Sequence, residues 1–176
     1  MKKHRFRAVV SFMILLLGYS PGQAKLIDSP LVDDYALQTL YIFSFTKYVE
    51  WPSGNKAVKI GVVSNDSAEE YLTKMAKAKS TATVEISVIN TKNETELGTC
   101  QIIFIPSNNT HLATRLIDRF GGQPILIITE EADLIKKGAS VSFKAVGGKL
   151  RFQINEEAAK SRGLKVSSSL IALAEK

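Results

Sequence analysis

The chain has 176 residues, with 23 lysine and arginine residues against 17 aspartate and glutamate residues, and a formal net charge of +6. Four of the basic residues lie in the first seven positions, so residues 25–176 carry a net charge of only +2. This length suits one compact domain, and so small a positive excess predicts no nucleic-acid-binding surface.

The first 24 residues have the composition of a secretory signal peptide. A basic start, MKKHRFR, precedes a ten-residue apolar run, Ala8–Leu17, and then GYSPGQA, which places small residues at Gly22 and Ala24. We therefore expect residues 1–24 to be removed on export, leaving residues 25–176 as a single domain. A retained membrane anchor is the less favoured alternative, because a ten-residue apolar run is too short to span a bilayer as a helix.

A helix is expected next, from about Leu31 to Glu50. Ser29 can cap its first turn. Pro52 disfavours helical geometry in the residue before it, and so ends the helix.

Strand and helix signals then alternate along the chain. Runs rich in β-branched residues predict strands over Ala57–Ser64, Ala82–Asn90, Cys100–Pro106 and Gln123–Thr129. The segments between and after them predict helices over Ser67–Lys79, Asn109–Phe120 and Glu130–Lys137.

The pattern changes in the last quarter. Two alternating runs, Ala139–Val146 and Lys149–Ile154, flank a Gly-Gly pair and predict a β-hairpin. Asn155 can cap a helix over Glu156–Arg162, and KVSSSLIALAEK predicts a closing helix. The fold class expected is α/β: a three-layer Rossmann-like sandwich, with a mainly parallel sheet and a C-terminal antiparallel hairpin.

Residues suited to catalysis are few. Cys100 is the only cysteine and His111 the only histidine after residue 24, so no intramolecular disulfide and no Cys/His metal cage can form. The acidic pairs fall in first turns of predicted helices, where they complement the helix dipole. No glycine-rich phosphate loop is present. We expect no metal, no cofactor and no enzymatic activity, although an exported enzyme that pairs Cys100 with His111 stays open as a third hypothesis.

The stretch YIFSFTKYVEWP, Tyr41–Pro52, carries aromatic residues on every side of the predicted helix. One side presents Leu37, Leu40, Tyr41, Ser44, Tyr48 and Trp51, whereas Ile42, Phe43, Phe45 and Val49 lie elsewhere around the axis. A sheet can cover one side only. Either the helix is a core helix covered twice, or the remaining rings form a protein-contact face or a small-molecule recess. In a recess, Lys47 beside the rings would attract an anionic or aromatic ligand.

Several segments together resemble the YfiR/HmsC family of periplasmic proteins. They are KYVEWP, KIGVVS, CQIIFIP, KKGASVSF and, most specifically, the closing GGKLRFQINEEAAKSRGLKVSSSLIALA. The resemblance implies a periplasmic protein that binds the outer portion of an inner-membrane diguanylate cyclase and holds it inactive. Release would raise cyclic di-GMP and promote biofilm formation. It also implies a homodimer, and contacts made by the aromatic helix and a neighbouring pocket.

Three positions depart from the family pattern. Only Cys100 is available, so a disulfide switch within one chain is excluded. Lys47 stands where arginine is common, which keeps the charge and loses the bidentate donor, so the identity of a family ligand does not transfer. Gln101 also stands where histidine is frequent in the family.

Our principal hypothesis is therefore a periplasmic repressor of a membrane diguanylate cyclase or similar signalling protein. The alternative is a periplasmic small-molecule binding protein that serves a two-component sensor or an uptake system. In either case the residues expected to contact partner or ligand are Tyr41, Phe45, Lys47, Tyr48, Glu50, Trp51, Arg151 and Asn155, with Asn155 also expected as a helix cap.

Overall fold

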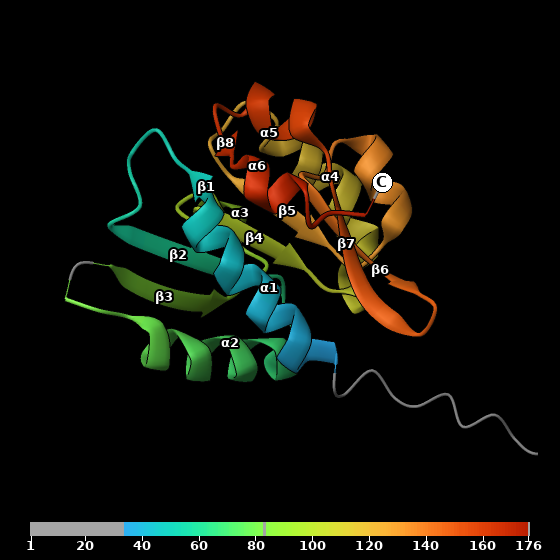
Figure 1. Ribbon diagram of the computed structural model, residues 1–176. Helices are drawn as coiled ribbons and strands as arrows, with labels where there is room; N and C mark the ends of the chain where they lie inside the picture. The colour runs from blue at the N-terminus through green and yellow to red at the C-terminus, as the bar shows by residue number, and fades with distance from the viewer. Residues whose placement is uncertain (1–33, 83, 176) are drawn as a thin grey trace, which may run out of the picture.

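A computed structural model describes residues 34–82 and 84–175 (Figure 1). The predicted signal peptide and the predicted cap at Ser29 lie outside the described residues. Within the described ranges, no helix combines the length and the apolar content needed to cross a bilayer.

Six strands form the central sheet in the order β3-β2-β4-β5-β6-β7. Their bounds are β2 Ala57–Val62, β3 Glu85–Asn90, β4 Ile102–Ile105, β5 Leu126–Thr129, β6 Val141–Val146 and β7 Lys149–Ile154. All neighbouring pairs are parallel except β6 and β7, which form the predicted antiparallel hairpin with Phe143 opposite Phe152. Every residue of β4 and β5 is buried, as their continuous apolar sequences require of strands covered on both faces.

Helices cover both faces of this sheet, which confirms the predicted three-layer α/β fold. One face carries α1 (Asp34–Tyr48), α2 (Asp66–Lys79) and α6 (Ser168–Ile171), and Figure 1 shows α1 crossing in front of the sheet, with α2 below β3 in this view. The other face carries α3 (Glu94–Leu97), the 3-10 helix η2 (Ser107–Leu112), α4 (Ala113–Arg119) and the 3-10 helix η3 (Ala132–Lys137). The helix α5 (Glu156–Ser161) follows β7.

A second, two-stranded sheet joins the end of α1 to the C-terminal segment. Val49–Glu50 (β1) pairs antiparallel with Lys165–Val166 (β8), with Glu50 opposite Lys165. The prediction of a helix continuing to Glu50 was wrong for this reason: its last two residues pair as a strand. The closing helix likewise begins after β8, at Ser168, with the Ser167 side chain as its cap.

Candidate functional site

The inner side of α1 packs into the first hydrophobic core. Phe45 is 0% exposed, and its ring centroid lies 5.3 Å from that of Phe152 and 6.5 Å from that of Phe143. Tyr41 is half-buried and lies 5.0 Å from the same Phe152 ring. These rings fix α1 against the hairpin β6–β7, and so fix which side of the helix faces outward.

The outer side of α1 is largely apolar and exposed. Leu37 is 38% exposed, Leu40 50% and Tyr48 43%. Half-buried Ser44 lies between them, with its hydroxyl donated to the Leu40 carbonyl at 2.9 Å. We call these four residues the α1 stripe. Their spacing of three to four residues places them in one line along the helix.

Charged residues stand at the C-terminal end of this stripe. Lys47 and Glu50 are both exposed. The Tyr48 carbonyl accepts a hydrogen bond from the Ser167 backbone amide at 2.9 Å, which ties this end of α1 to the C-terminal segment. The α1 stripe therefore ends beside an exposed cation, Lys47, and an exposed anion, Glu50, on a backbone that is hydrogen-bonded to the C-terminal segment.

The structure corrects the expectation for two of the predicted contact residues. Phe45 is enclosed in the core, and Trp51 is only 4% exposed, with its indole Nε1 donating to the Gln101 carbonyl at 3.1 Å. Phe45 is covered by the rings of β6 and β7, and Trp51, which follows β1, is enclosed in the same core. An enclosed Trp51 also offers no open ring face to a ligand beside Lys47.

Arg151 and Asn155 lie elsewhere. Arg151 is exposed on β7, directly opposite Lys144 on β6. Asn155 is confirmed as the cap of α5, since its Oδ1 accepts from the Ala158 amide at 2.9 Å and its Nδ2 donates to the Ile135 carbonyl at 2.9 Å. The eight predicted residues are thus not gathered in one site. Sequence reasoning did not single out Leu37 and Leu40 as exposed apolar residues, although it had placed them on the side that carries Tyr48.

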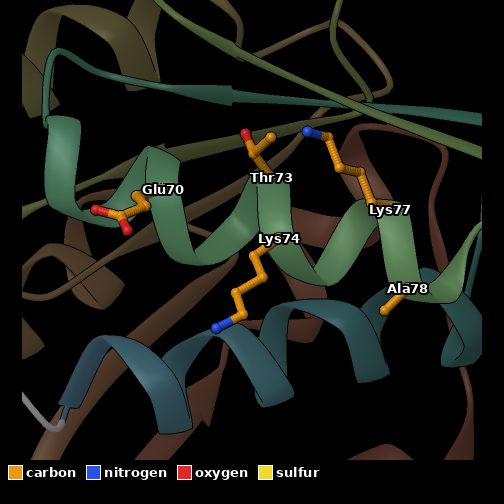
Figure 2. Close-up of a pocket in the computed structure, with 5 residues that line it drawn as sticks. All are labelled: Glu70, Thr73, Lys74, Lys77 and Ala78. Atoms are coloured by element: carbon orange, nitrogen blue, oxygen red, sulfur yellow. The ribbon is translucent and has the colours of Figure 1, made fainter.

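A shallow hollow lies on the neighbouring helix α2. It has a volume of about 530 Å³ and is lined by Glu70, Thr73, Lys74, Lys77 and Ala78. Figure 2 shows that all five come from α2 and that the Lys74 side chain extends toward α1. Because all its lining residues lie on one helix, this hollow is too open to enclose a ligand. It instead adds charged groups beside the helix that carries the α1 stripe.

A polar cluster lies where parallel α/β sheets commonly bind ligands. The connection after β2 leads to α2 on one face, whereas the helices before and after β4 lie on the other, so the crevice between β2 and β4 is the topological switch point. There the Asn65 side chain donates to the Tyr35 hydroxyl at 2.9 Å and to the Asn108 side chain at 3.2 Å.

The polar groups of this cluster satisfy one another's hydrogen-bonding capacity. The Asn65 Oδ1 accepts from the Ala68 amide and caps α2, and the Asn65 amide donates to the Asn90 side chain. Burial, followed by the charge of Glu130, raises the pKa of Tyr35, so its hydroxyl stays protonated. The hydrogen bond from Asn65 to Tyr35 holds the start of α1 in place, and the Phe143 and Phe152 rings hold its middle.

The two residues considered for catalysis, Cys100 and His111, do not have the surroundings of an activated catalytic pair. Cys100 is buried, and burial raises the pKa of its thiol to about 11. His111 is exposed in η2. Across residues 34–82 and 84–175, no three His, Cys, Asp or Glu side chains come together as metal ligands would.

Comparison with known families settles the resemblance seen in the sequence. A family model described as YfiR/HmsC-like matches residues 35–175, almost the whole described chain. The chain belongs to the YfiR/HmsC-like family. At the level of the family, YfiR/HmsC-like proteins are periplasmic regulators of diguanylate cyclase signalling.

Two solved structures share the fold of this YfiR/HmsC-like chain. One is an ABC domain in complex with L-Trp from Streptococcus pneumoniae, with a TM-score of 0.53, 12% identity, and coverage of 80% of this chain and 59% of that one. The other is a conserved domain protein from Vibrio cholerae O1 biovar El Tor, with a TM-score of 0.52, 16% identity, and coverage of 80% and 58%. The chain spans less than two thirds of either, and such low identities show the fold alone. No curated protein matches the sequence.

Proposed function

We propose that this protein binds the outer portion of an inner-membrane diguanylate cyclase through the α1 stripe and holds the cyclase in its inactive state. Loss of this contact would raise cyclic di-GMP and favour biofilm formation. Family membership supports the class of role. The exposed apolar side of α1 is the observation that supports the surface.

The α1 stripe has the composition of a contact surface. Leu37, Leu40 and Tyr48 expose apolar area in one line, which is energetically favourable to cover at about 25 cal/mol per Å². Lys47 and Glu50 stand at one end, where charges select and orient a partner more than they strengthen binding. Inhibition then needs only that the protein bind the inactive cyclase more tightly than the active one.

Leu40→Asp tests the proposed surface. A carboxylate in the covered interface would be desolvated without a counter-ion, so capture of the periplasmic part of the cyclase should weaken at least tenfold. The variant should also fail to lower cyclic di-GMP in cells that lack the native gene. A photo-crosslinking residue at position 40 identifies the membrane protein that is contacted.

The matched control is Thr114→Asp, because Thr114 is exposed on α4, which covers the opposite face of the sheet. It should capture the cyclase and restore low cyclic di-GMP as the unchanged protein does. Equal behaviour of the two variants would overturn the assignment of the surface. If Leu40→Asp instead converts a dimer to a monomer that still captures the cyclase, the α1 stripe is a dimer contact.

A further inference from the structure

The hairpin β6–β7 gathers three cations and one apolar residue on a single face. Lys144 lies opposite Arg151, and Val146 lies opposite Lys149. Side chains alternate between the two faces along a strand, and residues directly opposite each other share a face. All four side chains therefore stand on the same side of the hairpin. We call these four residues the basic hairpin face.

The protein leaves the charges of the basic hairpin face unpaired. The hairpin segment Val141–Ile154 contains no Asp or Glu, and no carboxylate in the described part of the chain lies within 4.0 Å of the three cations. Lys149 and Arg151 are exposed, and Val146 is 39% exposed. The like-charged pair Lys144–Arg151 disfavours the folded hairpin. A local cost that no contact within the protein offsets is expected where a surface has a function.

The tip of the hairpin stands clear of the rest of the molecule. Figure 1 shows β6 and β7 extending past the neighbouring helices to a free turn. Gly147 and Gly148 form this turn with φ angles of 57° and 73°, and a Cβ added at either would meet nothing within 4 Å. On the opposite face, the Phe143 and Phe152 rings pack against α1. The basic hairpin face is thus carried on an anchored projection.

Such a projection suits a flat anionic surface better than a protein partner. Residues 144–151 are eight in number, two of them glycine, whereas a stable protein interface involves about 20–30 residues a side. A bilayer requires no such area, because each Lys or Arg beside anionic headgroups strengthens binding about fivefold. An apolar side chain between the cations can enter the boundary between headgroups and acyl chains.

We propose that the basic hairpin face docks on the anionic phospholipid headgroups of a membrane, with Val146 at the inner boundary of the headgroup layer. Three cations make this contact weak, reversible and sensitive to salt. The basic hairpin face is separate from the α1 stripe, and its docking does not depend on the proposed cyclase contact.

The test is flotation of the purified protein with lipid vesicles. Vesicles of phosphatidylethanolamine and phosphatidylglycerol are compared with vesicles in which phosphatidylcholine replaces the phosphatidylglycerol. The protein is used in its exported form and its mass is checked, because an uncleaved apolar run at Ala8–Leu17 would itself bind either bilayer. In low salt the partition coefficient should be at least about tenfold higher for the anionic vesicles. High salt should abolish most of this difference.

A triple substitution removes the charge of the basic hairpin face. Lys144→Gln, Lys149→Gln and Arg151→Gln together should lower partition onto the anionic vesicles on the order of 100-fold, at about fivefold for each cation. The substitutions also remove the like-charged pair, so urea unfolding should show no loss of stability.

The matched control makes the same change of net charge at the opposite edge of the sheet. Lys74→Gln, Lys77→Gln and Lys79→Gln alter exposed residues of α2, which packs against the edge strand β3, whereas the hairpin ends in the edge strand β7. This variant should partition onto the anionic vesicles almost as the unchanged protein does.

Val146→Trp reports whether the tip reaches the bilayer. Trp51 is the only tryptophan of the chain and is buried, so a change of emission on vesicle binding comes from the introduced ring. The emission should shift to the blue with the anionic vesicles and stay unchanged with the neutral ones. An unchanged emission with both would contradict the proposed position of Val146.

Three results would overturn the proposal. No preference for anionic vesicles would mean that the cations serve only to keep the edge strand β7 from pairing with other chains. Equal losses in the two triple variants would assign the binding to net charge. If the hairpin variant still floats with the anionic vesicles but no longer captures the cyclase, the basic hairpin face is a protein contact instead.

Discussion

Phe45 belongs to the interior although it lies on the helix proposed to contact a partner. Its ring is 0% exposed and packs against Phe143 and Phe152. Phe45→Ala should therefore lower the free energy of unfolding by roughly 3–5 kcal/mol, through lost burial and the cavity left behind. Urea unfolding followed by circular dichroism measures the change.

Leu40→Ala is the appropriate comparison for Phe45→Ala. Leu40 is 50% exposed on the same helix, so its truncation should change the free energy of unfolding by less than about 1 kcal/mol. A Phe45→Ala protein as stable as Leu40→Ala would contradict the packing described for α1. The pair also separates stability from binding, since only Leu40 lies in the α1 stripe.

Cys100 should behave as an inert thiol in the folded protein. Burial raises its pKa from 9.0 to about 11, which lowers the thiolate fraction at pH 8 by about 100-fold. Labelling by iodoacetamide at pH 8 should therefore be at least 100-fold slower in buffer than in denaturant. Rapid labelling of the folded protein would contradict its burial and revive the hypothesis of an active cysteine.

The same shift gives Cys100 a pH-dependent effect on stability. The folded thiol holds its proton to a higher pH than the unfolded thiol, so its contribution is complete below pH 9 and is lost as the pH rises toward about 11. In that window the free energy of unfolding should fall with a slope steeper by up to about 1.4 kcal/mol per pH unit than in Cys100→Ala. Identical slopes would show that the thiol titrates alike in both states.

At the scale of elements, the hairpin β6–β7 carries an unfavourable pair. Lys144 and Arg151 lie directly opposite each other, and like charges at that position destabilise a sheet. Arg151→Glu should raise the free energy of unfolding by about 0.5 kcal/mol, because it replaces repulsion by attraction. Thermal unfolding in low salt measures the gain, which should shrink in high salt.

Lys149→Glu is the control for the hairpin, since Lys149 lies opposite the apolar Val146 rather than a charge. It makes the same change of net charge without forming a pair. If both substitutions raise stability equally, the effect comes from net charge and not from the cross-strand pair. Loss of cyclase capture in Arg151→Glu alone would extend the proposed contact surface to this hairpin.

The helix α1 shows what the sequence reveals about an element and what it omits. The aromatic residues on every side of Tyr41–Pro52 correctly indicated a helix with more than one apolar side. They did not reveal which side is covered, because that depends on α2 and on the hairpin, both distant in sequence. The two-residue strands β1 and β8 were missed since strands so short have no periodicity, and only their mutual pairing defines them.

At the scale of the molecule, the layered fold was predictable because most of its strands have strong local signals. Buried runs such as Ile102–Ile105 and the Gly-Gly hairpin specify the parallel sheet and its antiparallel edge almost without tertiary information. The burial of Arg162 was not predictable. Nothing in the letters SRGL distinguishes a buried arginine from an exposed one, because its burial arises where α5, Ser140 and α4 meet.

The chain carries one natural probe on each face of its sheet, which allows a test of whether the two cores form one unit. Trp51, the only tryptophan, lies in the core beneath α1, and Cys100, the only cysteine, lies in the core beneath α4. One strand layer contributes side chains to both cores, and the Trp51 indole bonds to Gln101, the neighbour of Cys100. We therefore expect Trp51 fluorescence and Cys100 pulse labelling to give the same urea midpoint.

Two separate midpoints would contradict this single unit, and their order would name the weaker face. Earlier exposure of Cys100 would indicate that α3 and α4 leave the sheet while α1 stays packed. Earlier change at Trp51 would indicate the opposite, and would mean that the surface carrying the α1 stripe is lost before the rest of the fold. Coincident midpoints would instead show that the two cores unfold as one cooperative unit, so that a ligand that binds only the folded state at either face would stabilise both.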